Sequence, residues 1–365
     1  MSVLDGAIGD VVYLTRCALD GGVPDAERVA AMDLDGVFRI SQRHLLVSAC
    51  ASALESAGVR DARFAQAHYK AVRKAALMDA ERAELFRRMD AAGIWHVPLK
   101  GSVLQDYWPA YGMRQMADND ILFDASRAGD ARTIMEEMGF TTEYFDRGNH
   151  DVYHKEPVYN FELHRELFNS AHDRRIYEYY RDCPKLLAPD GDGTFGRHFS
   201  DEDFYVYLVA HEHKHYSGSG TGLRSLADVF VWLRAKEGAL DWSYIAAQLD
   251  ALGIAEFEES NRHLATALFA GEALAQEQEA MLGYMADSGT YGTMAHNVGN
   301  QLARYGRAGY LVRRAFPPLQ TMKMLYPVLS RVPVLLPACW VWRLASAVAT
   351  KPKKVAYQLT AAFRK

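Results

Sequence analysis

Residues 99–123 read LKGSVLQDYWPAYGMRQMADNDILF, and this stretch decides how the rest of the chain is interpreted. A short apolar run ends in Gly-Ser, and later Asp118 and Asp120 flank Asn119 just before the apolar residues 121–123. Side chains alternate along a β-strand, so the two aspartates are expected on one face, about 6–7 Å apart. Two like charges on one face repel each other, and a divalent cation such as Mg²⁺ compensates them through carboxylate oxygens. The pair therefore indicates a metal site.

A third carboxylate is found in the stretch NFELHREL at residues 160–167. Glu162 alternates with the apolar Phe161 and Leu163, so its side chain is expected on the opposite face of a strand. If this strand lies beside residues 119–123, Asp118, Asp120 and Glu162 converge. Three carboxylates around two metal ions are the arrangement used for in-line phosphoryl or nucleotidyl transfer. We therefore predict these three acids as catalytic residues and metal ligands.

The Gly-Ser pair is predicted to bind phosphate. It follows a strand within residues 94–99 and precedes a helix that begins at about residue 103, whose free backbone N–H groups suit an anion. Gly101 lets the backbone come close to a ligand, and the Ser102 hydroxyl can donate to the same group. Lys100 and Arg114 add positive charge, Arg114 through a bidentate fork.

Together these motifs resemble the DNA polymerase beta-like nucleotidyltransferase superfamily. The matching residues are Leu99-Lys100-Gly101-Ser102, Asp118-Asn119-Asp120 and Glu162. The sequence pattern LKG…YGMRQMADND…FELH resembles, more narrowly, a bacterial family of uncharacterised nucleotidyltransferases. The resemblance is strongest over residues 80–235. The residue between the two acids is usually aliphatic in that superfamily. Here it is Asn119, so either its amide is satisfied beneath the sheet or the strand is distorted.

The resemblance implies an enzyme that transfers a nucleoside monophosphate from a nucleoside triphosphate, such as ATP, and releases pyrophosphate. Its cofactors would be two Mg²⁺ ions, or Mn²⁺. Asp118 and Asp120 would hold both ions, and Glu162 would bind the ion that activates the acceptor. The acceptor stays open: a sugar, a small metabolite, a peptide or protein side chain, or a lipid-linked intermediate. An inactive nucleotide- or partner-binding module on the same fold is the alternative.

A histidine cluster lies further along the chain, in LVAHEHKHYSG. The resemblance implies a helical domain that closes over the triphosphate and brings His211, His215 and Arg224 to it, with Asp228 orienting Arg224 one turn away. The same stretch also satisfies the H-E-x-x-H pattern of a zinc metallopeptidase, His211-Glu212-x-x-His215. Glu237 and Asp241 would then offer a third ligand and its partner. This alternative leaves the acids at 118–120 unexplained.

The order of elements predicts an α+β fold: a small mixed sheet with helical regions before and after it. Short β-branched or aromatic runs between residues 94 and 166 predict the strands, with a helix at about 127–138. Gly191, Gly193 and Gly196 match G-x-G-x-x-G, but the strand and helix that this motif needs are not expected around it. The predicted regions are a helical region 1–92, a nucleotidyltransferase core 93–190, a helical domain 191–287 and a basic helical region 288–365.

Charge is divided unevenly along the chain. Its net charge is −5, yet no Asp or Glu follows Asp287, and residues 288–365 carry 12 Lys and Arg. Such a tail predicts an anionic partner: membrane lipid, nucleic acid or the acidic body of the same protein. Nucleic acid is disfavoured because residues 1–287 carry 46 acidic residues against 29 basic ones.

The tail also contains the apolar run VPVLLPACWVW at residues 332–342. It is too short to cross a bilayer and is interrupted by Pro333 and Pro337. We expect it to pack against the helical domain, with a peripheral membrane contact as the alternative. The N-terminus does not read as a secretory signal and the four cysteines have no paired spacing. We therefore predict a cytoplasmic protein, or one at the membrane periphery.

Overall fold

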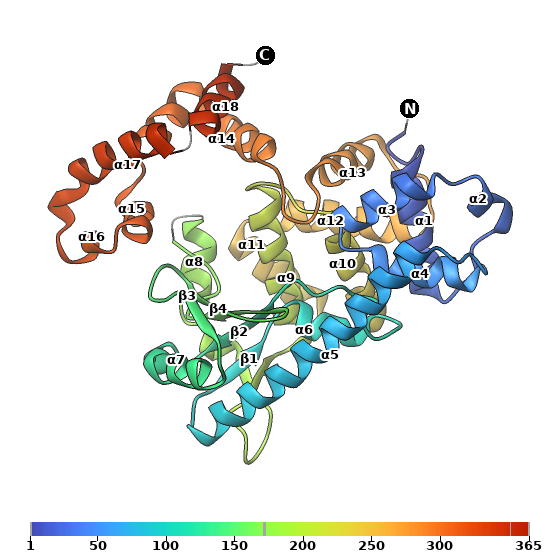
Figure 1. Cartoon of the computed structure of the whole chain (residues 1–365), viewed down its shortest axis with the longest axis horizontal. Helices are drawn as coiled ribbons and strands as arrows, with labels where there is room; N and C mark the ends of the chain where they lie inside the picture. Colours follow the sequence, from blue (N-terminus) through green and yellow to red (C-terminus); the bar gives the residue numbers. More distant parts are fainter. Residues whose placement is uncertain (1, 171–172, 351, 364–365) are drawn as a thin grey trace.

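A five-stranded mixed sheet lies in the middle of the chain, in the order β1-β2-β5-β4-β3. The computed structural model, shown in Figure 1, describes residues 2–170, 173–350 and 352–363. β2 and β5 run parallel, and the other neighbouring pairs are antiparallel. The strands are β1 His96–Pro98, β2 Asn119–Phe123, β3 Thr141–Tyr144, β4 His150–Lys155 and β5 Tyr159–His164. Each falls within a run that the sequence predicts as a strand, so the α+β class is confirmed.

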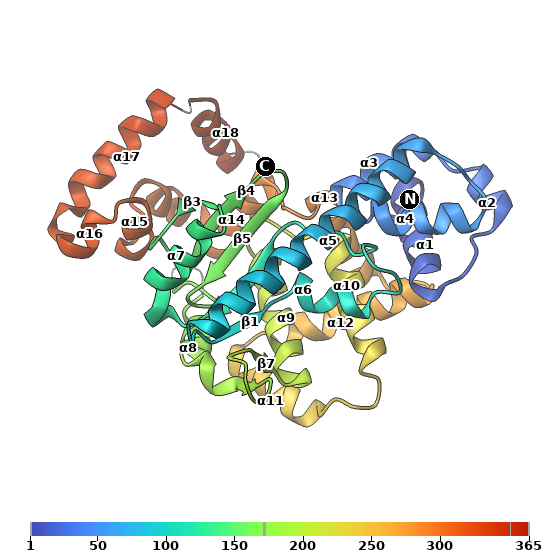
Figure 2. The same ribbon diagram turned by 60° about the horizontal axis from the view of Figure 1, so that its bottom comes forward.

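One face of the sheet is apolar and packs on two helices. The long helix α5 (Ala62–Ala91) and the shorter α7 (Ala128–Glu137) cover it, and Figure 2 shows α5 running along the sheet. Ile121 and Phe123 of β2 and Phe161 and Leu163 of β5 are buried in this layer. Because side chains alternate along a strand, Asp120 and Glu162 are left on the opposite face.

Asn119 sits on the α5 side of β2 without distorting the strand. Its Nδ2 donates to the Met78 carbonyl at 3.1 Å, and its Oδ1 accepts from Arg82 at 2.9 Å. Of the two arrangements that the sequence left open, the amide is therefore satisfied beneath the sheet. A buried amide with both ends paired costs little, which explains how a polar residue replaces the usual aliphatic one.

Helices from both ends of the body share a second and larger core. Residues of α1, α4, α9, α10 and α12 belong to it, and α1 contacts α12 directly. Ser200 caps α9 by accepting from the backbone N–H of Asp203. The N-terminal and post-sheet helices are α1 Ala7–Asp20, α2 Ala26–Ala30, α3 Leu34–Arg43, α4 Val47–Ser56, α8 Arg174–Tyr180, α9 Asp201–Tyr216, α10 Leu223–Ala235, α11 Trp242–Leu252, α12 Ala255–Ala270 and α13 Gln276–Ser288.

Short elements connect these layers. Gly191 and Gly193 lie in the turn of a small hairpin formed by β6 (Leu187–Pro189) and β7 (Arg197–Phe199), so the glycine motif there is a hairpin turn. The remaining short elements of the body are α6 Gly101–Leu104 and the 3₁₀ helices η1 Gln105–Tyr107, η2 Ala125–Arg127 and η3 Cys183–Leu186.

The last part of the chain, residues 294–350 and 352–363, forms an arm whose first helix begins against the body and whose helices α15 to α18 extend from it in both views (Figures 1 and 2). It comprises α14 Met294–Ala315, α15 Leu319–Leu325, α16 Val328–Arg331, η4 Pro333–Leu335, α17 Leu336–Thr350 and α18 Pro352–Phe363. The prediction that residues 332–342 pack against the helical domain is wrong. Val334 and Val341 are 79% and 69% exposed. The main contacts of α17 are with η4, α15 and α18 of the arm and not with the helical domain.

Candidate active site

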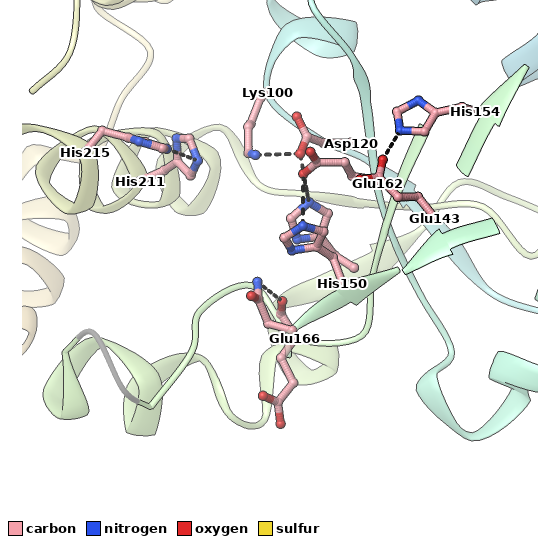
Figure 3. Close-up of polar contacts among 11 residues, drawn as sticks. Lys100, Asp120, Glu143, His150, His154, Glu162, Glu166, His211 and His215 are labelled. Atoms are coloured by element: carbon pink, nitrogen blue, oxygen red, sulfur yellow. Dashed lines mark hydrogen bonds and ion pairs between the residues drawn. The ribbon is translucent and has the colours of Figure 1, made fainter. Parts of the chain in front are cut away.

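The three predicted acids meet at one cavity. Asp120 of β2 lies directly opposite Glu162 of β5 in the parallel pair, while Asp118 lies just before β2 rather than in the strand. All three line a cavity with a volume of about 380 Å³. Figure 3 shows Asp120 and Glu162 close together, with Lys100 and His150 nearby. The convergence expected from strand alternation is therefore present.

Two basic groups hold Asp120. Lys100 Nζ lies 2.6 Å from Asp120 Oδ1, and His164 Nε2 lies 2.7 Å from the same oxygen. Burial alone would raise the pKa of Asp120, but Lys100 and His164 outweigh it and hold the pKa below its usual range. Asp120 is consequently the acid that stays ionised.

The other two acids behave differently. Burial, with the negative charge of Asp120, raises the pKa of Asp118. Burial, with the charges of Asp120 and Asp118, raises the pKa of Glu162 to about 7. Burial and mutual repulsion thus disfavour the ionised forms of Asp118 and Glu162. A bound divalent cation would relieve this repulsion, so the donor set fits such an ion.

The Gly-Ser turn has a different internal arrangement from the one predicted. Ser102 Oγ donates to the Leu99 carbonyl at 2.8 Å and does not line the cavity, so its hydroxyl is engaged by the backbone. A Cβ at Gly101 would lie 2.5 Å from Arg114 Nη1, so glycine is needed there to admit the guanidinium. The turn therefore shapes the cavity through Lys100 and Arg114.

Arg114 and Asp228 form a buried ion pair across the cavity floor. Arg114 Nε and Nη2 lie 2.7 and 2.8 Å from the two carboxylate oxygens of Asp228, and Trp108 Nε1 donates to one of them at 3.1 Å. The prediction that Asp228 orients Arg224 is therefore wrong. Arg224 instead donates to the Gln115 carbonyl at 2.7 Å and lines the cavity beside Asp118. Burial and the Arg114 charge lower the pKa of Arg224 to about 10.

Comparison with known protein families agrees with this geometry. The model of a family described as uncharacterised nucleotidyltransferase matches residues 30–270, about two thirds of the chain. The chain belongs to this family. The family resemblance drawn from the motifs is thereby confirmed, and membership of the family implies a nucleotide substrate. No curated protein and no solved structure matches the chain.

Helix α9 supplies the wall opposite the acids. His211 and His215 both line the cavity, with their Nε2 atoms 3.1 Å apart. Burial lowers the pKa of His211 well below its ordinary value, so the ring is neutral. Lys214 lies on the same wall, and burial, together with the charge of Lys100, lowers its pKa to about 8. The structure thus brings together the predicted residues of α9 and α10 with the acids of the sheet.

Three residues of the candidate site were missed in the sequence: His150, His164 and Lys214. His164 could have been found, because it follows Glu162 by two positions on one strand and must share its face. Lys214 follows His211 by three positions, which places it on the same side of a helix. His150 is brought in by its pairing with His164 between β4 and β5, and no local pattern predicts that pairing.

The zinc-peptidase alternative does not fit the arrangement of Glu212, Glu237 and Asp241. Glu212 is buried and accepts from Asn261 Nδ2 at 2.8 Å, whereas a peptidase needs this carboxylate at a metal-bound water. Asp241 caps α11 by accepting from the backbone of residues 243 and 244, and Glu237 is exposed. Within the described residues, the group placed closely enough to hold a metal consists of His150, Glu162 and His164.

Proposed function

We propose that this protein is a metal-dependent nucleotidyltransferase, which transfers a nucleoside monophosphate from a nucleoside triphosphate such as ATP to an acceptor hydroxyl. The observation that carries the proposal is the register of Asp120 and Glu162 on adjacent parallel strands, with Asp118 beside them. Family membership supports nucleotidyl transfer. The metal requirement is our inference from the crowding of the three acids.

Asp118, Asp120 and Glu162 would hold the Mg²⁺ ions, or Mn²⁺. When bound, these ions would stabilise negative charge on the reacting phosphate as Lewis acids. Glu162 has a pKa raised to about 7, which suits a group that takes the proton of the acceptor hydroxyl. The acceptor oxygen forms a bond to the α-phosphorus, the bond to the β-phosphate oxygen breaks, and pyrophosphate leaves.

The cationic residues around the acids would bind the triphosphate. Lys100, Lys214 and Arg224 all line the cavity and face the acids. Lys100 neutralises Asp120 in this structure, and a cation bound at Asp120 would free its ammonium group for a phosphate oxygen. Arg114 is fully engaged by Asp228, so its role is to shape the turn at Gly101. His211 and His215 complete the wall around the nucleotide, His211 as a neutral ring.

The test follows the label of the triphosphate. The full-length protein is incubated with Mg²⁺, cell extract and triphosphates labelled at either the α- or the γ-phosphate. We expect α-label to become fixed to an acceptor while γ-label is released as pyrophosphate. Asp120→Asn should abolish fixation, and the exposed Asp130→Asn should not. Triphosphate binding without pyrophosphate release would instead identify a nucleotide-binding module and overturn the proposed activity.

A further inference from the structure

Two imidazoles flank Glu162 in one corner of the cavity. His150 of β4 pairs with His164 of β5, and Glu162 lies two residues before His164 on the same strand. Glu162 Oε2 is 3.6 Å from His150 Nε2 and 3.7 Å from His164 Nε2. One ligand atom from each residue lies within 4.8 Å of the other two. Figure 3 shows His150 directed at the carboxylates of Asp120 and Glu162.

The donor set distinguishes this corner from a magnesium site. Mg²⁺ takes oxygen ligands, whereas imidazole nitrogen suits Zn²⁺ and its neighbours among the first-row metals. Ligands about 2.0–2.2 Å from a tetrahedral ion lie roughly 3.3–3.6 Å apart. The two separations from Glu162 are close to that spacing, and His164 Nε2, which bonds to Asp120 at 2.7 Å, would exchange this contact for the ion.

We propose that His150, Glu162 and His164 form a site for a borderline-soft divalent metal ion such as Zn²⁺, with Asp120 as the adjacent acid. This Zn²⁺ site rests on the proposed function and deepens it, because Glu162 belongs both to it and to the proposed magnesium site in the same cavity. The nucleotidyltransferase would then carry one position for a nitrogen-preferring ion beside a position formed by Asp118 and Asp120. The binding itself can be measured without nucleotide or turnover.

The experiment uses full-length protein stripped of metal with a chelator. ZnCl₂ is titrated by calorimetry, and CoCl₂ by visible absorption, whose intensity reports a tetrahedral nitrogen–oxygen environment. We expect one strongly bound equivalent, and a loss of affinity of at least about tenfold in His150→Ala and in His164→Ala. His154→Ala is the matched control, since His154 lies on the same strand but is exposed and pairs with Glu143.

Unchanged Zn²⁺ affinity in both histidine variants, with circular dichroism like that of the parent, would overturn the metal site. So would a loss of affinity confined to His211→Ala and His215→Ala, which would place the ion on α9. Zn²⁺ binding that depends on His150 and His164 in a protein without pyrophosphate release would support the site and contradict the proposed function. Failure of the metal site and failure of the proposed activity therefore give different results.

A second inference comes from the arm, whose helix α17 presents an apolar face to solvent. Val341, Trp342 and Val348 are 69%, 66% and 60% exposed. The single charged residue of α17, Arg343, turns inward and donates to the Arg314 and Ala315 carbonyls. A surface helix of a globular domain has the opposite arrangement, with its apolar side inward. Residues 333–350 have a mean hydropathy of 1.3, and 6% of them are buried.

The arm around α17 is strongly basic. Residues 288–365 carry 12 Lys and Arg and no acid, and Arg307, Arg313, Arg331 and Lys353 are exposed. An exposed apolar face beside clustered positive charge suits a bilayer surface that contains anionic lipid. Residues 333–350, which combine η4 and α17, are long and apolar enough by length and composition alone to cross a membrane. The contacts of α17 with α15 and α18 hold it within the arm, which favours a position along the interface over one across the membrane.

We infer that the arm docks on an anionic membrane surface, with the outer face of α17 at the boundary between headgroups and acyl chains. Trp342 on this face has the amphipathic ring that is enriched at that depth. The contact is independent of nucleotidyl transfer, since the arm lies outside the cavity that holds the acids.

Sedimentation with vesicles tests the membrane contact. Full-length protein is mixed with vesicles of phosphatidylcholine alone or of phosphatidylcholine with phosphatidylglycerol. We expect binding to the anionic vesicles, weakened by salt, and at least about tenfold weaker binding in Val341→Glu/Val348→Glu. Val23→Glu is the matched control, because Val23 is also 69% exposed but lies on the N-terminal body.

Three results would overturn the membrane contact. One is the absence of binding to anionic vesicles, and another is equal binding by the α17 variant and by Val23→Glu. The third is a dimer in analytical ultracentrifugation that Val341→Glu/Val348→Glu dissociates, with no vesicle binding by the parent, since a second copy would then cover α17.

Discussion

The sheet and the arm use apolar side chains in opposite ways. In β2 and β5, Ile121 and Leu163 are completely buried, and their burial leaves Asp120 and Glu162 on the cavity side. In α17, Val341 and Trp342 are exposed while Arg343 turns inward. The sheet buries its apolar side chains against other parts of the chain, whereas the outer face of α17 would be buried only by a partner. Four predictions test this difference.

Asp120→Asn should have the largest effect, because it changes the acidic face of the sheet on which the proposed activity depends. The change removes the acid that stays ionised and that both Lys100 and His164 contact. We expect pyrophosphate release to fall at least about 1,000-fold, equivalent to about 4 kcal/mol of barrier. Steady-state pyrophosphate assays measure it, with circular dichroism to show folding. Activity within tenfold of the parent would contradict the assigned role.

Asp228→Ala should have the second largest effect, because it leaves the buried charge of Arg114 without its partner. Arg114 would lose both of its carboxylate contacts while it stays in the cavity floor. Removal of one partner of a buried pair costs about 3–5 kcal/mol. Urea unfolding measures the change in the free energy of unfolding. Arg224→Ala is a useful comparison, since Arg224 bonds to a backbone carbonyl; a double variant that loses clearly less than the sum of the two single losses would show that Asp228 serves Arg224 after all.

A pair of alanine variants compares the two regions directly. Ile121→Ala should lower the free energy of unfolding by about 2–5 kcal/mol, since its side chain is completely buried. Val341→Ala should change it by less than about 0.5 kcal/mol, because its side chain already contacts solvent. Both are measured by urea unfolding without lipid. A loss above 1–2 kcal/mol for Val341→Ala would mean that the α17 face is covered within the protein.

The pH dependence of cation binding should be the smallest effect. The pKa of Glu162 is raised to about 7, so below that pH the metal-free acid is protonated and a cation must displace the proton. We expect affinity for Mg²⁺ to fall up to about tenfold per pH unit below pH 7 and to level off above it. Calorimetric titration across pH measures this, and Glu162→Gln should flatten the profile below pH 7.

Much of the sheet and its acids could be predicted from local patterns. The alternation in NDILF and NFELH assigns side chains to two faces, and the structure places Asp120 and Glu162 opposite each other as expected. Patterns within one helix also brought His211 and His215 to one side. The partner of Asp228 could not be predicted in this way, because helical spacing suggested Arg224 while the packing of α10 selected Arg114, 114 residues away.

The sequence by itself determined which residues share a face of a strand or helix, because backbone geometry repeats every two residues or every turn. It thereby determined the acidic face of β2 and β5 and the charge of the tail. Only the tertiary structure decided that His150 joins Glu162, that Ser102 bonds to its own turn and that α17 faces solvent. These outcomes depend on the packing of distant segments, which no local repeat specifies.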